Sequence, residues 1–199
     1  MEAILNFDWK VFEWVENCLW NPVLDVVMTI ITYLGEGGAV WIAVGVILLL
    51  TKKYRTVGVA VIAALFVHLL VNDFLLKNII ERPRPFDLEA WEGVFKYPEL
   101  VSKPSSYSFP SGHSSSAFAC ATALIMSKKK GIYIPALAFA AVMAFSRVYI
   151  HVHYFSDIVA GATAGILYGI IAIFIVNLFK PVVLKAYDKI KLKRSKKDA

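Results

Sequence analysis

Six stretches of apolar residues, separated by short polar segments, constrain the fold of this chain more than any other feature. They cover roughly residues 21–35, 38–51, 57–77, 114–127, 131–150 and 155–180. A helix needs about 20 apolar residues to cross a bilayer; the third, fifth and sixth runs reach that length, and the others need flanking residues. Of the 199 residues, 58% are hydrophobic, more than a soluble domain carries. The sequence therefore predicts an all-α polytopic membrane protein, a bundle of six transmembrane helices.

The first 20 residues differ from these runs because acids interrupt an apolar segment rich in tryptophan. Asp8 and Glu13 are two of these acids. An amphipathic helix lying in the membrane interface fits the pattern, and a long, tilted first helix fits it equally well. The pattern is not that of a cleavable signal peptide, because no basic start precedes an apolar core. We expect an interfacial segment, a six-span domain and a basic tail, at residues 1–20, 21–181 and 182–199.

Basic residues predict which side of the membrane each connection faces. Lysine and arginine gather between the second and third runs, between the fourth and fifth, and after the sixth, at residues 52–55, 128–130 and 180–197. Cytoplasmic connections carry such an excess, so six spans would place both termini and these segments in the cytoplasm. The outer face would then receive residues 35–38, 78–112 and 151–154. This distribution assigns the net charge of +6 to membrane topology and not to a nucleic-acid partner.

Three polar clusters fall on the expected outer face, and the first one follows the third apolar run. Lys77 lies at the end of that run, and Arg84 follows the helix-breaking Pro83. Lysine offers a point charge and arginine a planar fork that matches phosphate oxygens. Interfacial snorkelling of both cations is the alternative. The rest of this loop carries aromatic residues, Trp91 among them, which fits either a lid on the lipid headgroups or an anchored connector.

The second cluster, Pro110-Ser111-Gly112-His113, opens the fourth apolar run. A helix that begins here has free backbone N–H groups, and such a start binds anions. Ser111 adds a hydroxyl, Gly112 permits close approach of the backbone, and His113 can donate or accept a proton at the edge of the site. The alternative is a helix cap with an incidental histidine.

The third cluster lies between the fifth and sixth runs. Arg147 ends the fifth run, and His153 and Asp157 are four residues apart. If the sixth helix begins near Tyr154, the carboxylate reaches the imidazole, fixes its tautomer and orients its other nitrogen for attack. His151 and His153 are poor candidates for a metal site, because no cysteine or cluster of acids accompanies them. We expect no metal and no cofactor, and we expect His68, in the middle of the third run, to be a packing residue.

The patterns Lys-x6-Arg-Pro, Pro-Ser-Gly-His and Ser-Arg-x5-His-x3-Asp, in this order and spacing, resemble the three motifs of the type 2 phosphatidic acid phosphatase superfamily. They read here Lys77 to Pro85, Pro110 to His113 and Ser146 to Asp157, with no departure from the motifs. The resemblance covers roughly residues 20–180. Size and expected spans are similar to the bacterial integral-membrane branch, which includes phosphatidylglycerophosphate phosphatases and undecaprenyl pyrophosphate phosphatases.

The resemblance implies a metal-independent phosphatase of the cell membrane. It implies that His153 attacks phosphorus, that Asp157 orients His153, and that His113 protonates the leaving oxygen. The implied phosphate-binding residues are Lys77, Arg84, Ser111, Gly112 and Arg147. The implied substrate is a membrane lipid: phosphatidate, phosphatidylglycerophosphate or undecaprenyl pyrophosphate. A phosphatase of small soluble esters and a non-enzymatic lipid transporter are the alternatives.

Overall fold

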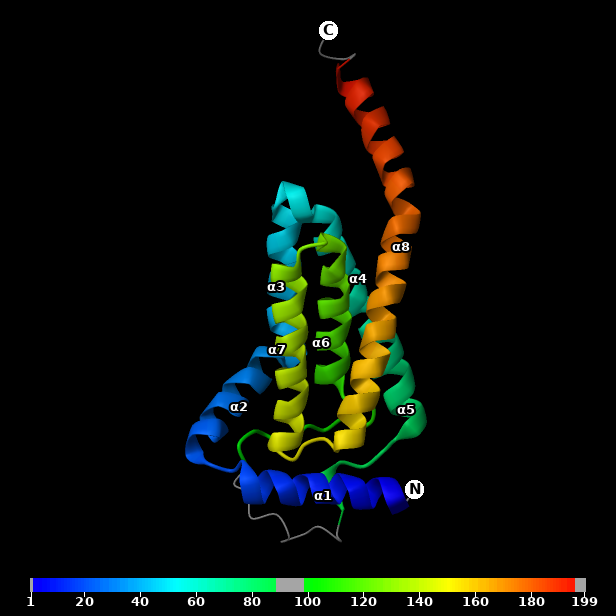
Figure 1. Ribbon diagram of the computed structural model, residues 1–199. Coiled ribbons are helices and arrows are strands. Elements are labelled where there is room, and N and C mark those ends of the chain that lie inside the picture. The colour runs from blue at the N-terminus through cyan, green and yellow to red at the C-terminus, as the bar shows by residue number, and fades with distance from the viewer. Residues whose placement is uncertain (1, 89–98, 196–199) are drawn as a thin grey trace.

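The computed structural model describes residues 2–88 and 99–195, with side chains described as far as residue 181. Every regular element in this part of the chain is a helix, which confirms the predicted all-α class. Figure 1 shows α3, α4, α6, α7 and α8 running along one another, while α1 lies across one end of this bundle. Trp91, in the loop for which a lid was one expectation, lies outside the described residues.

The helices follow the chain in this order: α1 (Glu2–Cys18), α2 (Pro22–Leu34), η1 (Glu36–Gly38), α3 (Ala39–Leu50), η2 (Lys52–Tyr54), α4 (Arg55–His68), η3 (Leu69–Leu76), α5 (Lys77–Ile80), η4 (Pro85–Asp87), α6 (Gly112–Ala123), η6 (Leu124–Ser127), α7 (Lys130–Tyr149) and α8 (Phe155–Ser195). Short 3-10 turns make up η1, η2, η4 and η6, whereas η3 is a π-helical stretch that joins α4 to α5.

The expected count of six spans is not confirmed. Within the described residues, three helical segments are long and apolar enough to cross a membrane: Lys52–Asp87, Lys130–Tyr149 and Phe155–Pro181. The first two apolar runs are α2 and α3, which meet at a bend of 50° and pass the same test only as a pair. Gly37 and Gly38, with φ of 55° and 72°, form the corner. Two successive apolar runs therefore need not be two membrane crossings, because glycines can introduce a bend within a single crossing.

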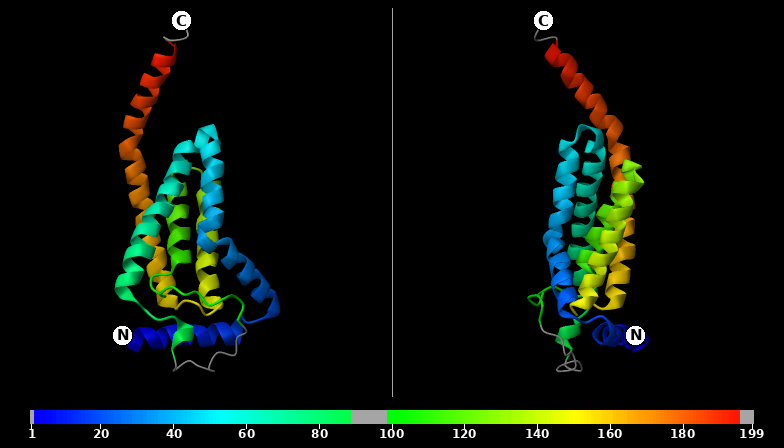
Figure 2. Two further views of the ribbon diagram at one scale, coloured as in Figure 1. Left: turned by 180° about the vertical axis from the view of Figure 1, so that it is seen from behind. Right: turned by 60° about the vertical axis from the view of Figure 1, so that its left-hand side comes forward.

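Helix α1 packs on the bundle while exposing apolar side chains on its other side. Phe12 and Val15 are buried, and so is Asp8, whereas Phe7 and Trp14 are about half exposed. Helix α1 lies crosswise to the bundle helices (Figure 1), and its place in the membrane interface stays a prediction. Its start and the end of α8 lie at opposite ends of the bundle, as Figure 1 and Figure 2 show. This arrangement differs from the expectation that both termini lie on one side of the membrane.

Helix α6 lies in the centre of the bundle and packs against α8 through glycines spaced four residues apart. A Cβ built on Gly161, Gly165 or Gly169 would lie 2.7, 2.4 or 2.6 Å from a backbone oxygen of α6 or its cap. Only glycine permits such an approach, and small residues at this spacing are common where membrane helices meet closely. The close contact brings the start of α6 to the start of α8, where the Ser111 N–H donates to the Asp157 carbonyl at 3.2 Å. Two of the three motifs thereby meet at one end of the bundle.

Candidate active site

A cavity of about 570 Å³ lies where the three motifs meet. Its polar wall carries six of the eight residues expected to form the site: Lys77, Arg84, Gly112, His113, Arg147 and His153. Its other wall is apolar and comes from α3, α4 and η3, with Ile42, Ile62, Leu65, Phe66 and Leu69. The cavity thus combines a cationic side with an apolar side, which suits an anionic headgroup attached to a hydrocarbon chain.

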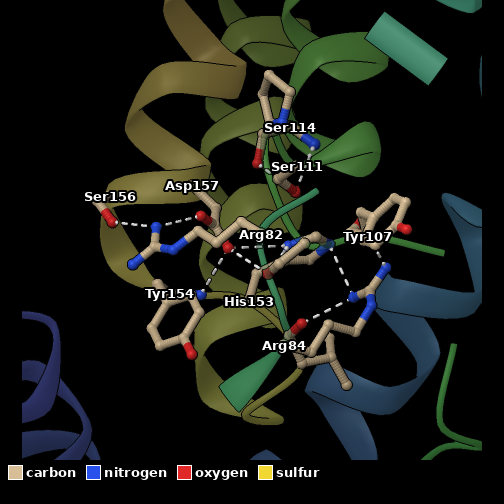
Figure 3. A network of polar contacts seen from close by, with 12 residues as sticks. Arg82, Arg84, Tyr107, Ser111, Ser114, His153, Tyr154, Ser156 and Asp157 are labelled. Atoms are coloured by element: carbon tan, nitrogen blue, oxygen red, sulfur yellow. Dashed lines mark hydrogen bonds and ion pairs between the residues drawn. The ribbon is translucent and has the colours of Figure 1, made fainter. Parts of the chain in front are cut away.

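His153 and Asp157 form a buried pair at the turn between α7 and α8. The imidazole Nδ1 lies 3.3 Å from the Asp157 carboxylate, and Nε2 lies 3.3 Å from a guanidinium nitrogen of Arg84. Figure 3 shows the ring between these two groups. Because arginine can only donate, we assign Nε2 as the acceptor and Nδ1 as the protonated nitrogen facing Asp157. The arrangement leaves a neutral imidazole with its lone pair directed toward Arg84 and the cavity.

Local backbone geometry explains why this pair forms. Asp157 lies in the first turn of α8, and its carboxylate accepts from the Tyr154 N–H at 3.1 Å, as the third helical residue does in a capping box. The His153 N–H donates to the Arg147 carbonyl at 3.2 Å and closes the turn after α7. Burial, together with the cations Arg84, Arg147 and Lys77, lowers the pKa of His153 well below its usual value. The imidazole therefore stays unprotonated, and available as a nucleophile, at neutral pH.

Arg84 joins its own loop to two other segments of the site. Its guanidinium donates to the carbonyls of Ser106, Tyr107 and Val152 at 2.6, 3.4 and 2.8 Å. Only 3% of Arg84 is exposed, so these bonds fix the side chain and, with it, the two chain segments that it contacts. The side chain therefore does not snorkel toward water, the alternative that the sequence left open for it.

Arg147 projects from the end of α7 and keeps unused bonding capacity in the cavity. One guanidinium nitrogen donates to the Thr32 hydroxyl at the end of α2. Its Nε is buried and has no hydrogen-bond partner among the described residues. A buried donor without a partner is costly, so the fold holds this side chain at the cavity against an energetic penalty.

Lys77 is held by a polar chain that runs through the π-helical stretch η3. Its ammonium lies 3.0 Å from one oxygen of Asp73, whose other oxygen is 3.3 Å from His68 Nε2. His68 Nδ1 in turn lies 2.9 Å from the Ser115 hydroxyl on α6. From the sequence we expected His68 to be a packing residue only. It does more, since it lines the cavity and helps place Asp73. Such π-helical stretches occur frequently at functional sites.

Three successive residues at the start of α6, Ser111, Gly112 and His113, have different roles in the site. The Ser111 hydroxyl caps the helix, accepting from the Ser114 N–H and hydroxyl at 3.5 and 3.2 Å, and it is not among the described residues that line the cavity. Gly112 lies under Lys77, since a Cβ there would be 3.3 Å from the ammonium. His113 Nε2 lies 3.1 Å from the Thr32 carbonyl. His113 thus reaches the cavity, Gly112 lets Lys77 approach, and Ser111 supports the helix end.

Sequence reasoning missed four residues that hold these groups: Asp8, Thr32, Arg82 and Ser108. Thr32 contacts both Arg147 and His113, while the Ser108 hydroxyl and Arg82 both donate to Asp157. A signal existed for Asp8, because it shares its spacing with the buried Phe12 and Val15 on one face of α1. For Arg82, the available signal was its position two residues before Arg84, in an Arg-Pro-Arg-Pro run. Thr32 and Ser108 carried no comparable signal.

In a comparison with protein families, residues 53–181 match the family described as the PAP2 superfamily. The matched region contains all three motifs. Phosphatidylglycerophosphatase B of Bacillus subtilis is 35% identical over 160 residues, covering 74% of this chain and 72% of that protein. Undecaprenyl-diphosphatase of Sulfolobus acidocaldarius is 30% identical over 128 residues, and the match spans 63% of this chain but only 58% of that protein.

Two solved structures resemble the chain over most of its length. The crystal structure of a transmembrane PAP2 type phosphatidylglycerolphosphate phosphatase from Bacillus subtilis has a TM-score of 0.68 and 28% identity, and the match covers 92% of this chain and 89% of that one. The crystal structure of Aquifex aeolicus LpxE has a TM-score of 0.68 and 29% identity, with 82% and 93% covered. The crosswise α1 lies beyond the family match.

Proposed function

We propose a lipid phosphatase activity for this chain, which belongs to the PAP2 superfamily. The reaction is hydrolysis of a phosphate monoester or a pyrophosphate carried by a membrane lipid. The observation that carries the proposal is the imidazole of His153, held between Asp157 and Arg84 on the wall of a cavity that also contains Lys77 and Arg147. Relatives named as lipid phosphatases support the same assignment.

In the first step, the Nε2 lone pair of His153 attacks phosphorus, and the bond from phosphorus to the leaving oxygen breaks. His113 gives a proton to that oxygen, so the lipid leaves as a neutral alcohol or a lower phosphate. The Asp157 carboxylate compensates the positive charge that develops on the imidazole. The product of this step is a phosphohistidine on His153.

In the second step, water attacks the phosphohistidine and His113 takes its proton, so phosphate leaves and the neutral imidazole of His153 returns. Lys77, Arg84 and Arg147 stabilise the charge on the equatorial oxygens in both steps, which is the task that metal ions perform in many phosphotransferases. Gly112 lets the backbone approach the phosphate. For Ser111, we propose a supporting role at the start of α6, in keeping with its capping bond. We propose that no metal and no cofactor takes part.

The substrate that fits the cavity best is a phosphorylated lipid. Apolar residues such as Ile42, Leu65 and Phe66 line the same cavity as the cations, and a small soluble ester would leave this apolar lining unused. Phosphatidate, phosphatidylglycerophosphate and undecaprenyl pyrophosphate all present the required phosphate. Phosphate release by the purified protein in detergent, measured for these three lipids and for glycerol 3-phosphate, tests the proposal. Equal kcat/KM for glycerol 3-phosphate would favour the soluble-ester alternative, and no release from any lipid would reject lipid phosphatase activity.

For the topology, we propose that the site faces outward. The lysine-rich connections that contain η2 and that follow η6 lie at the end of the bundle opposite α1 (Figure 1), and basic connections favour the cytoplasm. The bent α2–α3 pair, α4 to α5, α6, α7 and α8 then form the crossings. Residues 21–181 form the phosphatase domain, residues 182–199 the cytoplasmic tail, and α1 lies in the outer interface.

Single-cysteine labelling in sealed cells tests this orientation. After Cys18 and Cys120 are replaced, Glu13→Cys on α1 should react with an impermeant maleimide, whereas Lys53→Cys and Lys129→Cys should not. The opposite labelling pattern would invert the topology.

A further inference from the structure

A second set of buried charges lies directly behind the His153–Asp157 pair. Asp8 on α1 is fully buried, although most of that helix is exposed, and Asp157 is fully buried as well. Arg82 lies between the two carboxylates and has ion pairs with both. Neither Asp8 nor Arg82 belongs to the three motifs, and both lie outside the cavity lining of the described residues.

Several hydrogen bonds and one cation–π contact join the residues of this set. One guanidinium nitrogen of Arg82 donates to Asp8 at 2.9 Å, and the other donates to Asp157 and to the Ser156 hydroxyl, the latter at 2.8 Å. Asp8 also accepts from the N–H and the hydroxyl of Ser156, at 2.8 and 2.6 Å. The plane of the guanidinium lies over the Tyr154 ring, 3.8 Å from its centroid. Figure 3 shows Arg82 beside Ser156, Tyr154 and Asp157.

These contacts determine how the Asp157 carboxylate is oriented. Arg82 binds Oδ1, which leaves Oδ2 for the Ser108 hydroxyl and for His153 Nδ1 at 3.3 Å. A carboxylate held at both oxygens cannot rotate about its own axis, so it directs one oxygen at the imidazole. Asp8 fixes Arg82 from the other side, and it fixes Ser156 next to Asp157 in the first turn of α8.

We propose that Asp8 and Arg82 are positioning residues that orient Asp157 and, through it, the nucleophile His153. The proposal rests on the phosphatase function above, and it makes α1 a component of the active site as well as an interfacial helix. The alternative is that the same contacts only fasten α1 to the bundle. The two differ in what they predict, because fastening alone does not set the rate at which His153 attacks.

The test is the rate of phosphoenzyme formation at saturating substrate, measured by rapid quench on the full-length protein in detergent with ³²P-labelled phosphatidate or polyprenyl pyrophosphate. Asp8→Asn preserves the shape of the side chain and removes its charge. Arg82→Lys keeps a cation and loses the fork that spans two carboxylates. Glu13→Gln makes the same kind of change at an exposed position of α1 and is the matched control.

We expect Asp8→Asn and Arg82→Lys to slow phosphoenzyme formation about tenfold or more, by analogy with the loss of a residue that orients a metal-binding histidine. We expect substrate affinity to stay within about twofold of wild type, since the cations that bind phosphate are not changed, and Glu13→Gln to match wild type throughout. Wild-type phosphorylation rates in both variants would overturn the proposal. A loss of affinity in proportion to the rate would also overturn it, because it would indicate general disruption of the site. A wild-type protein that turns over neither lipid would instead reject the function itself.

Discussion

The substitution Gly165→Ala tests how the bundle brings the motifs together. A Cβ at this position would lie 2.4 Å from the Ser115 carbonyl oxygen and 3.0 Å from the Phe118 Cβ, both on α6. Ordinary contact begins at 3.4 Å, so the two helices must separate by about 1 Å, because a backbone carbonyl cannot move aside as a flexible side chain can. Overpacking of this kind costs about 1–3 kcal/mol.

The separation also moves catalytic groups apart. His113 lies at the start of α6, and Asp157 lies at the start of α8. A misplacement of about 1 Å lowers an enzymatic rate roughly 100-fold, so we expect kcat/KM for phosphate release from a lipid to fall by about that factor. Thermal unfolding in the same detergent should show a lower Tm. The reasoning is refuted if Gly165→Ala retains wild-type activity and wild-type Tm.

Gly131→Ala is the matched control for this experiment. Gly131 lies in the first turn of α7, and a Cβ there meets no atom within 4 Å. Since alanine is favoured over glycine in a helix by about 0.5–1 kcal/mol, we expect unchanged activity and an equal or slightly higher Tm. A comparable loss in both variants would show that the effect does not come from the α6–α8 contact.

Three further predictions concern the chemistry. His113→Gln should lower kcat about 10²- to 10⁴-fold for a lipid alcohol leaving group and much less for p-nitrophenyl phosphate, which needs no proton; an equal loss for both substrates would contradict the acid role. Activity should persist in EDTA, and vanadate should inhibit by resembling the transferring phosphoryl group; loss in EDTA that a divalent ion restores would overturn the first part. Burial lowers the pKa of His151 to about 4. Between pH 6.5 and pH 4 this histidine is therefore protonated in the unfolded chain and neutral in the folded chain. The stability that is present above pH 6.5 is lost as the pH falls toward 4. Tm should therefore drop between pH 7 and pH 5, and His151→Asn, which tolerates the φ of 56°, should reduce the drop; an identical drop would reject this cause.

The sequence was sufficient for the fold class and for the polar wall of the cavity. Apolar composition predicted membrane helices, and the three motifs predicted side chains that the structure brings to one cavity. The lengths of the apolar runs did not predict the path of the chain between residues 22 and 50. The first two runs form two helices that meet at a corner at Gly37 and Gly38 and are long enough for a span only as a pair. The position of α1 was also left open by its pattern, since an interfacial helix and a long, tilted first helix fit that pattern equally well.

The supporting residues were less predictable, because their roles depend on contacts distant in sequence. Thr32 reaches Arg147 across 115 positions, and Asp8 reaches Ser156 across 148. An isolated threonine gives no local sign of such a partner, and the helical spacing of Asp8 with Phe12 and Val15 indicates burial without indicating what the carboxylate contacts. By contrast, Gly161, Gly165 and Gly169 are four residues apart, and this spacing by itself predicts a close contact between membrane helices. The sequence therefore contained a signal for the α6–α8 contact.

The central claim is that His153 carries the phosphoryl group during turnover, and trapping the intermediate tests it most directly. Quenching wild-type protein during reaction with ³²P-labelled lipid phosphate, followed by proteolysis and mass spectrometry, should reveal an acid-labile, base-stable phosphate on His153. The His153→Ala protein should bind substrate and show no adduct. A labelled residue other than His153, or equal labelling of His153→Ala, would contradict the account.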